Sequence, residues 1–187
     1  MPWLLFAFAL TESATSLAQN QYLITKIYFP RLIIPLAPIF TGLVDFLFAF
    51  ILLVGMMLFY GIVPKITILL FPVFLLLAMV ASFGVGVWLA ALTVEYRDLR
   101  YTIPFLVQFW MFASPIAYPS SLVPGRWKIL YALNPMTSVI EGFRWVLLGT
   151  AAPPLIPMLV SGAVVAMLAV GGIMNFHRLE STLADVI

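Results

Sequence analysis

The feature that most constrains this chain is the segment from residue 66 to residue 94, in which 29 consecutive residues carry no charged side chain. About 20 predominantly apolar residues are enough to cross the ~30 Å hydrocarbon core of a bilayer as a helix. Backbone N–H and C=O groups find no partners in lipid, so such a segment must be helical. The segment therefore predicts a membrane-spanning helix, and the rest of the chain must fold around it.

The whole chain has the composition of a membrane protein. Hydrophobic residues make up 64% of its 187 residues and charged residues only 9%, whereas soluble domains are about half apolar and about a quarter charged. A water-soluble fold of this size could not bury that much apolar surface. The apolar runs are continuous and do not alternate as barrel strands do. We therefore expect an all-α integral membrane protein.

Five segments are predicted to cross or enter the membrane, and the first is only partial. Eight apolar residues, 3–10, precede a polar stretch, and eight are too few to cross alone; an interfacial helix fits this region nearly as well. The second segment contains one charge, Asp45, which we expect near a helix end or paired with a neighbouring helix. The approximate bounds are 3–20, 36–60, 66–94, 102–118 and 155–176.

A compact charged bend, residues 95–101, separates the third segment from the fourth. Arg97 and Arg100 lie three residues apart, with Glu95 and Asp98 interleaved between and before them. At helical spacing these side chains can form local ion pairs, so one interpretation is a solvated turn. The alternative is a docking surface for a soluble partner, since a short charged loop between long helices is well placed to transmit force.

Residues 119–149 form a segment that is too long for a turn and too apolar for a loop in water. Pro124-Gly125 interrupts it once and Asn134-Pro135 interrupts it again. The pattern predicts two short helices, roughly 125–133 and 135–148, neither of which is long enough to cross a bilayer. A re-entrant hairpin follows, because irregular backbone is tolerated at membrane depth only where protein or a water cavity covers it.

The second helix of this hairpin carries its own start and stop signals. Asn134 is a suitable N-cap, Pro135 suits the first helical position, and Gly149 suits the residue after the last turn. Glu141 and Arg144 lie three residues apart and can pair on one face of the helix.

Motifs for catalysis and cofactor binding are lacking in the sequence. There is no cysteine, no phosphate-binding loop of the G-x-x-x-x-G-K-[ST] type, no H-E-x-x-H and no G-x-S-x-G. The lone His177 follows the last apolar segment beside Arg178, as an interfacial anchor would. We expect no enzyme, no metal site and no cofactor held by this chain. A net charge of +2 is too small to indicate nucleic-acid binding.

Three stretches carry a resemblance to a known family: LITKIYFPRLIIPL (23–36), VEYRDLRYTIPFLVQFWMFASPIAYP (94–119) and YALNPMTSVIEGFRWVLLG (131–149). With them, essentially the whole chain resembles the permease subunits of type-2 ABC exporters, in the branch that exports O-antigen, capsule-like and teichoic-acid polysaccharides. The resemblance implies a single permease domain over residues 1–187. Six spans behind an amphipathic helix are normal in that family, so this chain is expected to be N-terminally truncated.

The same resemblance implies partners and a location. The expected assembly is a homodimer in the bacterial inner membrane, in contact with lipid, with a separate ABC ATPase that binds ATP and Mg²⁺ on the cytoplasmic side. The expected cargo is a lipid-linked polysaccharide such as O-antigen. Two alternatives stay open: an exporter of the same fold that carries a drug or a lipid, and a truncated membrane protein that transports nothing.

Carried over by position, the resemblance assigns two groups of residues. Two loops would dock the ATPase, through Lys26, Tyr28, Arg31, Tyr96, Arg97, Asp98 and Arg100. The hairpin would form an outer gate on the translocation path, through Tyr118, Trp127, Tyr131, Asn134, Glu141, Arg144 and Trp145. The aromatic members Tyr118, Trp127, Tyr131 and Trp145 are candidates to contact sugar rings, although an anchoring role at the membrane interface is the favoured explanation for any single one of them.

Overall fold

The computed structural model describes residues 1–20, 22, 30–62, 65–116, 118 and 127–186. That part of the chain is helical and contains no strand, so the predicted all-α class is confirmed. The elements, in chain order, are α1 (Pro2–Gln19), α3 (Ile33–Phe59), the 3-10 helix η1 (Ile66–Leu70), α4 (Phe71–Glu95), α5 (Leu99–Phe112), α6 (Lys128–Ala132), α7 (Pro135–Leu148) and α8 (Leu155–Val186).

Three stretches are long and apolar enough to cross a membrane, judged by length and composition. They are Ile33–Phe59, Ile66–Glu95 and Leu155–Arg178. The chain is therefore a multi-pass membrane protein. Helix α5 has 14 residues and reaches only about 21 Å at ~1.5 Å per residue. The expected total of five membrane segments stays a prediction.

Helix boundaries differ from the expected ones mainly at α5 and α8. Helix α5 starts at Leu99, where residue 102 was expected, and ends at Phe112, where residue 118 was expected. Pro104 therefore lies inside the helix, not in its first turn, and leaves the carbonyl of Arg100 without its usual helical donor. Helix α8 continues past residue 176 to Val186, since the polar tail contains no glycine or proline.

Helix α4 lies at the centre of the bundle, packed against α1 on one side and α8 on another. The crossing with α8 is close: a Cβ added to Gly84 would lie 2.6 Å from the backbone nitrogen of Ala169, and one added to Gly172 would lie 2.6 Å from the carbonyl oxygen of Gly84. Small residues allow this approach of two backbones, as is common between membrane helices.

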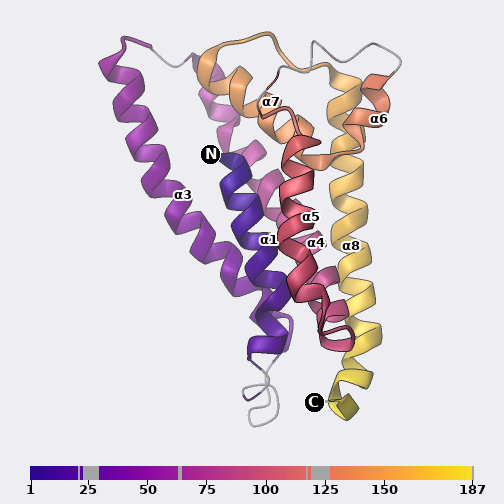
Figure 1. Ribbon diagram of the computed structural model, residues 1–187. Coiled ribbons are helices and arrows are strands. Elements are labelled where there is room, and N and C mark those ends of the chain that lie inside the picture. The colour runs from indigo at the N-terminus through magenta and orange to yellow at the C-terminus, as the bar shows by residue number, and fades with distance from the viewer. Residues whose placement is uncertain (21, 23–29, 63–64, 117, 119–126, 187) are drawn as a thin grey trace.

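Helix α3 packs less closely than the other long helices and diverges from them along its length (Figure 1). Its surface exposes many large apolar side chains, including those of Phe48, Ile51, Leu52 and Phe59. Asp45 is exposed on this helix and lies near its middle, so the expectation that it would lie near a helix end is wrong. Asp45 is one of the residues that line a hollow between α3 and α1, together with Leu4 and Phe8.

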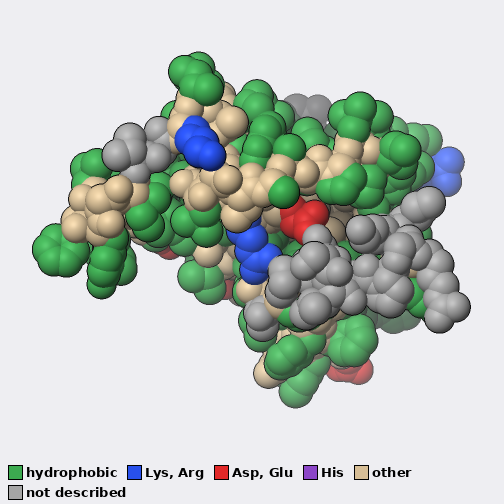
Figure 2. All heavy atoms as spheres, turned by 90° about the horizontal axis from the view of Figure 1, so that it is seen from above, with side chains coloured by type: hydrophobic (Ala, Val, Ile, Leu, Met, Phe, Trp, Pro, Cys, Tyr) green, Lys and Arg blue, Asp and Glu red, His purple; other side chains and the backbone are tan. Residues whose placement is uncertain are grey.

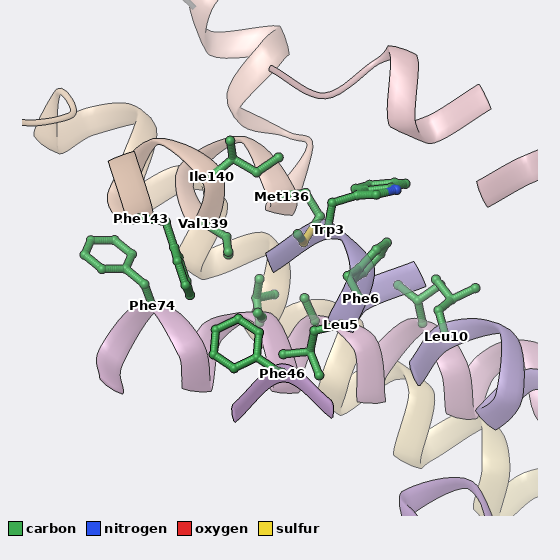
Figure 3. Close-up of a cluster of buried hydrophobic side chains, with 14 of the residues drawn as sticks. Trp3, Leu5, Phe6, Leu10, Phe46, Phe74, Met136, Val139, Ile140 and Phe143 are labelled. Atoms are coloured by element: carbon green, nitrogen blue, oxygen red, sulfur yellow. The ribbon is translucent and has the colours of Figure 1, made fainter. Parts of the chain in front are cut away.

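The larger hydrophobic core lies under α7. Figure 3 shows side chains of α1, α3, α4 and α7 converging there. Phe6 of α1, Phe74 of α4 and Met136 of α7 are almost completely buried in it. Gly142 faces Phe74 so closely that a Cβ at this position would overlap the ring. Through this contact α7 packs across the end of the bundle (Figure 1).

Candidate functional site

Helix α7 forms where the sequence signals predicted it. Asn134 has an extended backbone, and its side chain accepts a hydrogen bond from the backbone nitrogen of Met136 at 3.0 Å. Pro135 occupies the first helical position, where a missing N–H is tolerated. Gly149 ends the helix with a left-handed backbone at φ 65°. The shorter helix before it, α6, spans Lys128–Ala132 within the expected range of 125–133.

Asn134 also connects α7 to the end of α5. Its amide oxygen accepts from Trp110 Nε1 at 2.9 Å, and its amide nitrogen donates to the carbonyl of Ala113 at 3.1 Å and to Ser114 Oγ at 2.9 Å. A single side chain thus caps one helix and fixes the last turn of another. Such a fully used amide rigidifies the site around it.

Buried serine hydroxyls form hydrogen bonds that join α8 to α6 and α7. Ser161 Oγ, which is completely buried, donates to the carbonyl of Ala132 at 2.7 Å. Ser138 Oγ of α7 donates to the carbonyl of Pro157 at 3.4 Å. The acceptors are the carbonyl of the last residue of α6 and one in the first turn of α8, so α6, α7 and α8 are joined by hydrogen bonds at this point.

Arg144 holds the segment that follows α5. Its guanidinium donates to the carbonyl of Ile116 at 2.8 Å and to that of Tyr118 at 3.4 Å. Both bonds join α7 to residues more than 25 positions earlier in the chain. The ion pair expected between Glu141 and Arg144 stays a prediction.

Two tyrosines form further hydrogen bonds at the α7 end of the bundle. Tyr131 donates from its hydroxyl to the hydroxyl of Tyr118 at 2.7 Å, and Tyr118 donates to the carbonyl of Phe112 at 3.2 Å. Burial raises the pKa of the Tyr131 phenol, and the bond to Tyr118 raises that pKa further. The Tyr131 phenol therefore keeps its proton at physiological pH.

We call this set of bonds the polar network; its side chains are those of Trp110, Ser114, Tyr118, Tyr131, Asn134, Arg144 and Ser161. It unites four of the predicted gate residues. Trp127 is half exposed before α6, and Trp145 packs edge-on against Phe74 with ring centroids 6.4 Å apart. Sequence reasoning missed Trp110 on α5 and Ser114, which lies two residues beyond the end of that helix.

The C-terminal end of α7 is fixed by residues just before α4. Thr67 Oγ1 donates to the carbonyl of Val146 at 3.4 Å, and the Lys65 side chain lies against Gly149. A cation at the end of a helix also opposes the partial negative charge of its last carbonyls. Both ends of α7 are therefore tied to the bundle.

The charged bend lies at the opposite end of α4 from these contacts (Figure 1). Glu95, Tyr96, Arg97, Asp98 and Arg100 are all exposed. Arg100 donates to the hydroxyl of Tyr101 at 2.8 Å, with its guanidinium carbon 4.6 Å from the ring centroid. A hydrogen bond with the Glu95 carboxylate raises the pKa of the Tyr96 phenol.

Arg97 and Arg100 border a common hollow of about 160 Å³ beside Ala18 of α1. Arg97 also borders a wider hollow of about 680 Å³ with Glu95 and Asp98. The bend therefore presents both signs of charge on a concave surface. Such a surface gives orientation and selectivity to a docking protein.

The other predicted docking loop is described only in part. Lys26 and Tyr28 lie outside the described residues. Arg31 lies just before α3 and is partly buried. Ile34 of α3 shares a small buried cluster with Leu17 of α1 and Val94 of α4, so Arg31 and the bend lie at the same end of the bundle.

In the described part of the chain, no group of three His, Asp or Glu side chains could hold a metal ion. Fold and site together define a polytopic helical membrane protein with one hydrogen-bonded end and one charged end. Comparison with known families makes the class definite. The family described as ABC-2 type transporter matches residues 1–148, and the chain belongs to that family.

Curated relatives agree with this family. An O-antigen export system permease protein from Myxococcus xanthus is 28% identical over 170 residues, which are 90% of this chain and 65% of the relative. Two proteins of the same name from Klebsiella pneumoniae are each 27% identical, over 100% and 76% of this chain and over 72% and 56% of their own lengths. The chain thus spans between about half and three-quarters of these relatives, and the predicted resemblance is confirmed.

Proposed function

We propose that this chain is the membrane subunit of an ATP-driven exporter that moves a lipid-linked polysaccharide, such as O-antigen, across the bacterial inner membrane. The observation that carries the proposal is that three relatives, one of which aligns with the entire chain, are named as O-antigen export permeases. A drug or membrane-lipid exporter of the same fold would not account for that shared name.

The two ends of the bundle support two separate roles, a gate at the α7 end and a docking surface at the charged bend. The polar network closes the α7 end, where a gate must be rigid when shut and must open by breaking defined bonds. The charged bend, with Arg31 nearby, offers an accessible surface for a separate ABC ATPase. In this proposal the ATPase binds ATP and Mg²⁺, and the permease holds no cofactor and catalyses no reaction.

The proposed transporter is a homodimer, and the cargo moves along a path between the two copies of the chain. Exposed aromatic side chains on α5 support a covered or lipid-facing surface there: Phe105, Phe109 and Phe112 are 73%, 75% and 66% exposed. In water these rings would be unfavourable, whereas a bilayer or a second subunit would accommodate them.

Reconstitution with its ATPase tests the proposed function. The chain and a candidate partner ABC ATPase would be co-purified and placed in vesicles that contain a lipid-linked glycan. We expect glycan to become accessible to a glycan-cleaving enzyme on the far side only with hydrolysable ATP. A non-hydrolysable ATP analogue is the control. ATP-driven movement of a drug or phospholipid, with the glycan left in place, would favour the alternative cargo and refute this one.

A further inference from the structure

The smaller hollow at the charged bend differs from the wider one in the charges that line it. Its volume is about 160 Å³, and the described residues around it are Ala18, Thr93, Val94, Arg97 and Arg100; we call it the arginine hollow. Thr93 and Val94 are buried, so they close its inner side. Both charged residues among those described are arginines. The hollow is therefore a small basic cavity between the end of α1 and the end of α4.

The carboxylates of the bend line the other hollow. Glu95 and Asp98 border the wider hollow together with Arg97, and neither is among the described residues of the arginine hollow. The bend is neutral in formal charge, because its two acidic residues balance its two arginines. These charges are nevertheless separated in space, and positive charge prevails at the arginine hollow.

The two guanidiniums keep most of their hydrogen-bonding capacity. Each has five N–H donors. Arg100 makes one described hydrogen bond, to the neutral hydroxyl of Tyr101 at 2.8 Å. Within the part of the chain that the structure describes, Arg97 has no hydrogen bond or ion pair. Both side chains can therefore donate to an anion in the hollow that they share.

The start of α5 adds to the positive potential. Arg100 is the second residue of α5, and no acidic side chain lies in the first turn of this helix. The first turn of a helix already carries a partial positive charge, so an arginine there favours the approach of an anion. Ala18 lies near the C-terminal end of α1, and the partial negative charge of that end offsets only part of two full charges.

The arginine hollow lies at the depth of lipid headgroups. Thr93 and Val94 are among the last residues of Ile66–Glu95, a stretch long enough to cross the membrane. Exposed aromatic side chains, those of Trp88, Tyr96 and Tyr101, precede and follow them in the sequence. Trp and Tyr are enriched at the membrane–water interface, and basic pockets between helices at this depth bind the headgroups of anionic lipids.

The opposite end of the bundle has a different surface. Viewed from above, the α7 end shows mostly hydrophobic side chains with a few charged ones among them (Figure 2). The bend end instead places two guanidiniums at one hollow. An anionic headgroup would therefore be attracted to the bend end.

We propose that the arginine hollow binds the phosphate of one anionic membrane phospholipid through Arg97 and Arg100. An arginine can bind a phosphate through two parallel hydrogen bonds. The volume of about 160 Å³ is below the ~300 Å³ at which ligand pockets usually begin, so the phosphate enters and the acyl chains stay in the bilayer. This site goes beyond the export function, and the wider hollow remains available to a docking protein.

Native mass spectrometry tests the proposal by counting the lipids bound to each chain. The whole chain in detergent would be titrated with phosphatidylglycerol or with phosphatidylcholine, whose choline carries a compensating positive charge. We expect the first phosphatidylglycerol adduct at about tenfold lower lipid concentration, the factor given by one charge-assisted contact. Equal binding of the two lipids would overturn the proposal.

A matched pair of substitutions in α1 locates the site and leaves the bend unchanged. Ala18→Glu puts a carboxylate where the phosphate would bind, so the preference for phosphatidylglycerol should disappear. Ala18→Gln adds a side chain of the same size without the charge and should keep the preference. An unchanged preference in Ala18→Glu would refute the site.

Substitutions of the cations give a second comparison. Arg97→Gln with Arg100→Gln should abolish the preference for phosphatidylglycerol, whereas Lys65→Gln, at the α7 end, should leave the preference unchanged. The same loss in both variants would mean that the preference follows total charge, and the arginine hollow would then not be the site. The pair at Ala18 decides the question even if the double arginine variant does not fold.

Two competitors separate the possible sources of the phosphate. Inorganic phosphate in large excess should leave the bound phosphatidylglycerol in place, because a free ion is not concentrated in the detergent micelle. A polyprenyl diphosphate, standing for the anchor of a lipid-linked cargo, should displace it no better than a second phosphatidylglycerol of different mass. Displacement by inorganic phosphate, or stronger displacement by the diphosphate, would overturn the proposal. These measurements involve neither the ATPase nor export, so their failure would not affect the proposed function.

Discussion

The polar side chains at the two ends of this bundle differ in their hydrogen-bond partners. At the α7 end, Asn134 takes part in four described hydrogen bonds and Arg144 in two, and most of these join segments far apart in the chain. At the charged bend, Arg100 bonds its sequence neighbour Tyr101, and Tyr96 bonds its neighbour Glu95. The α7 end is interlocked, meaning that its side chains join segments far apart in the chain. The charged bend is an exposed surface whose bonds join neighbouring residues.

This contrast separates residues that hold the fold from residues that are available to a partner. A buried polar group stabilises the fold only while all its bonds are made, and removing one partner leaves others unsatisfied. Exposed charges add little to the free energy of unfolding, because water already solvates them. Substitutions at the α7 end should therefore change stability, and substitutions at the bend should change association.

Asn134→Ala should give the largest loss of stability. It removes a helix cap and leaves Trp110 Nε1 without its described partner, which we expect to lower the free energy of unfolding by about 3 kcal/mol. Chemical denaturation in detergent, followed by circular dichroism, measures the loss. The matched control is Asn20→Ala, since the side chain of Asn20 donates one described bond, to the carbonyl of Ser16 at 2.8 Å.

A loss for Asn134→Ala no greater than that for Asn20→Ala would mean that the polar network is not interlocked. The contrast between the two ends would then fail at its strongest point.

Whether the sequence reveals a hydrogen bond of this network depends on how far apart its two residues lie along the chain. Asn134, Pro135 and Gly149 define α7 to the residue, because capping depends on neighbours a few positions away. The bond from Trp110 to Asn134 spans 24 positions, and nothing local indicates which face of α5 turns toward α7. The expected length of α5 was wrong for a related reason: an apolar run continues beyond the helix and does not mark its end.

The same limit explains Arg144. A spacing of three residues suggested Glu141 as its partner, because helical neighbours are the only partners that a sequence shows directly. That pair stays a prediction; the described bonds of Arg144 reach the carbonyls of Ile116 and Tyr118, and backbone acceptors carry no sequence signal. The charged bend, in contrast, could be located fully from sequence, because its exposure follows from its charge.

Gly149→Ala should have the next largest effect, a loss of about 1–2 kcal/mol in the free energy of unfolding. The residue has φ 65°, and an added Cβ would lie 3.0 Å from Cε of Lys65. Gly61→Ala is a close control, since Gly61 has φ 70° and nothing within 4 Å of its Cβ position. The difference between the two losses, measured by denaturation, isolates the Lys65 contact; equal losses would show that this contact is loose.

Tyr131→Phe should reduce stability by about 1 kcal/mol near neutral pH, the usual value of one hydrogen bond. The raised pKa of Tyr131 adds a pH dependence: the folded state keeps the proton that the unfolded chain loses, so stability should fall as pH rises above about 10. The variant should lose part of that fall. An identical alkaline profile in Tyr131→Phe would contradict the buried pair, and Tyr101→Phe at the bend serves as the control.

Replacement of both bend arginines, Arg97→Ala with Arg100→Ala, should have the smallest effect on stability, with no resolvable change in the unfolding midpoint, because both side chains are exposed. Association should change instead: the two arginines border one hollow, and loss of charge complementarity there should weaken co-purification of the ABC ATPase. Asn134→Ala should leave co-purification intact wherever the protein still folds. If the double variant retains its ATPase, the bend is not the docking surface, and if it unfolds more easily, the bend is not the open end of the comparison.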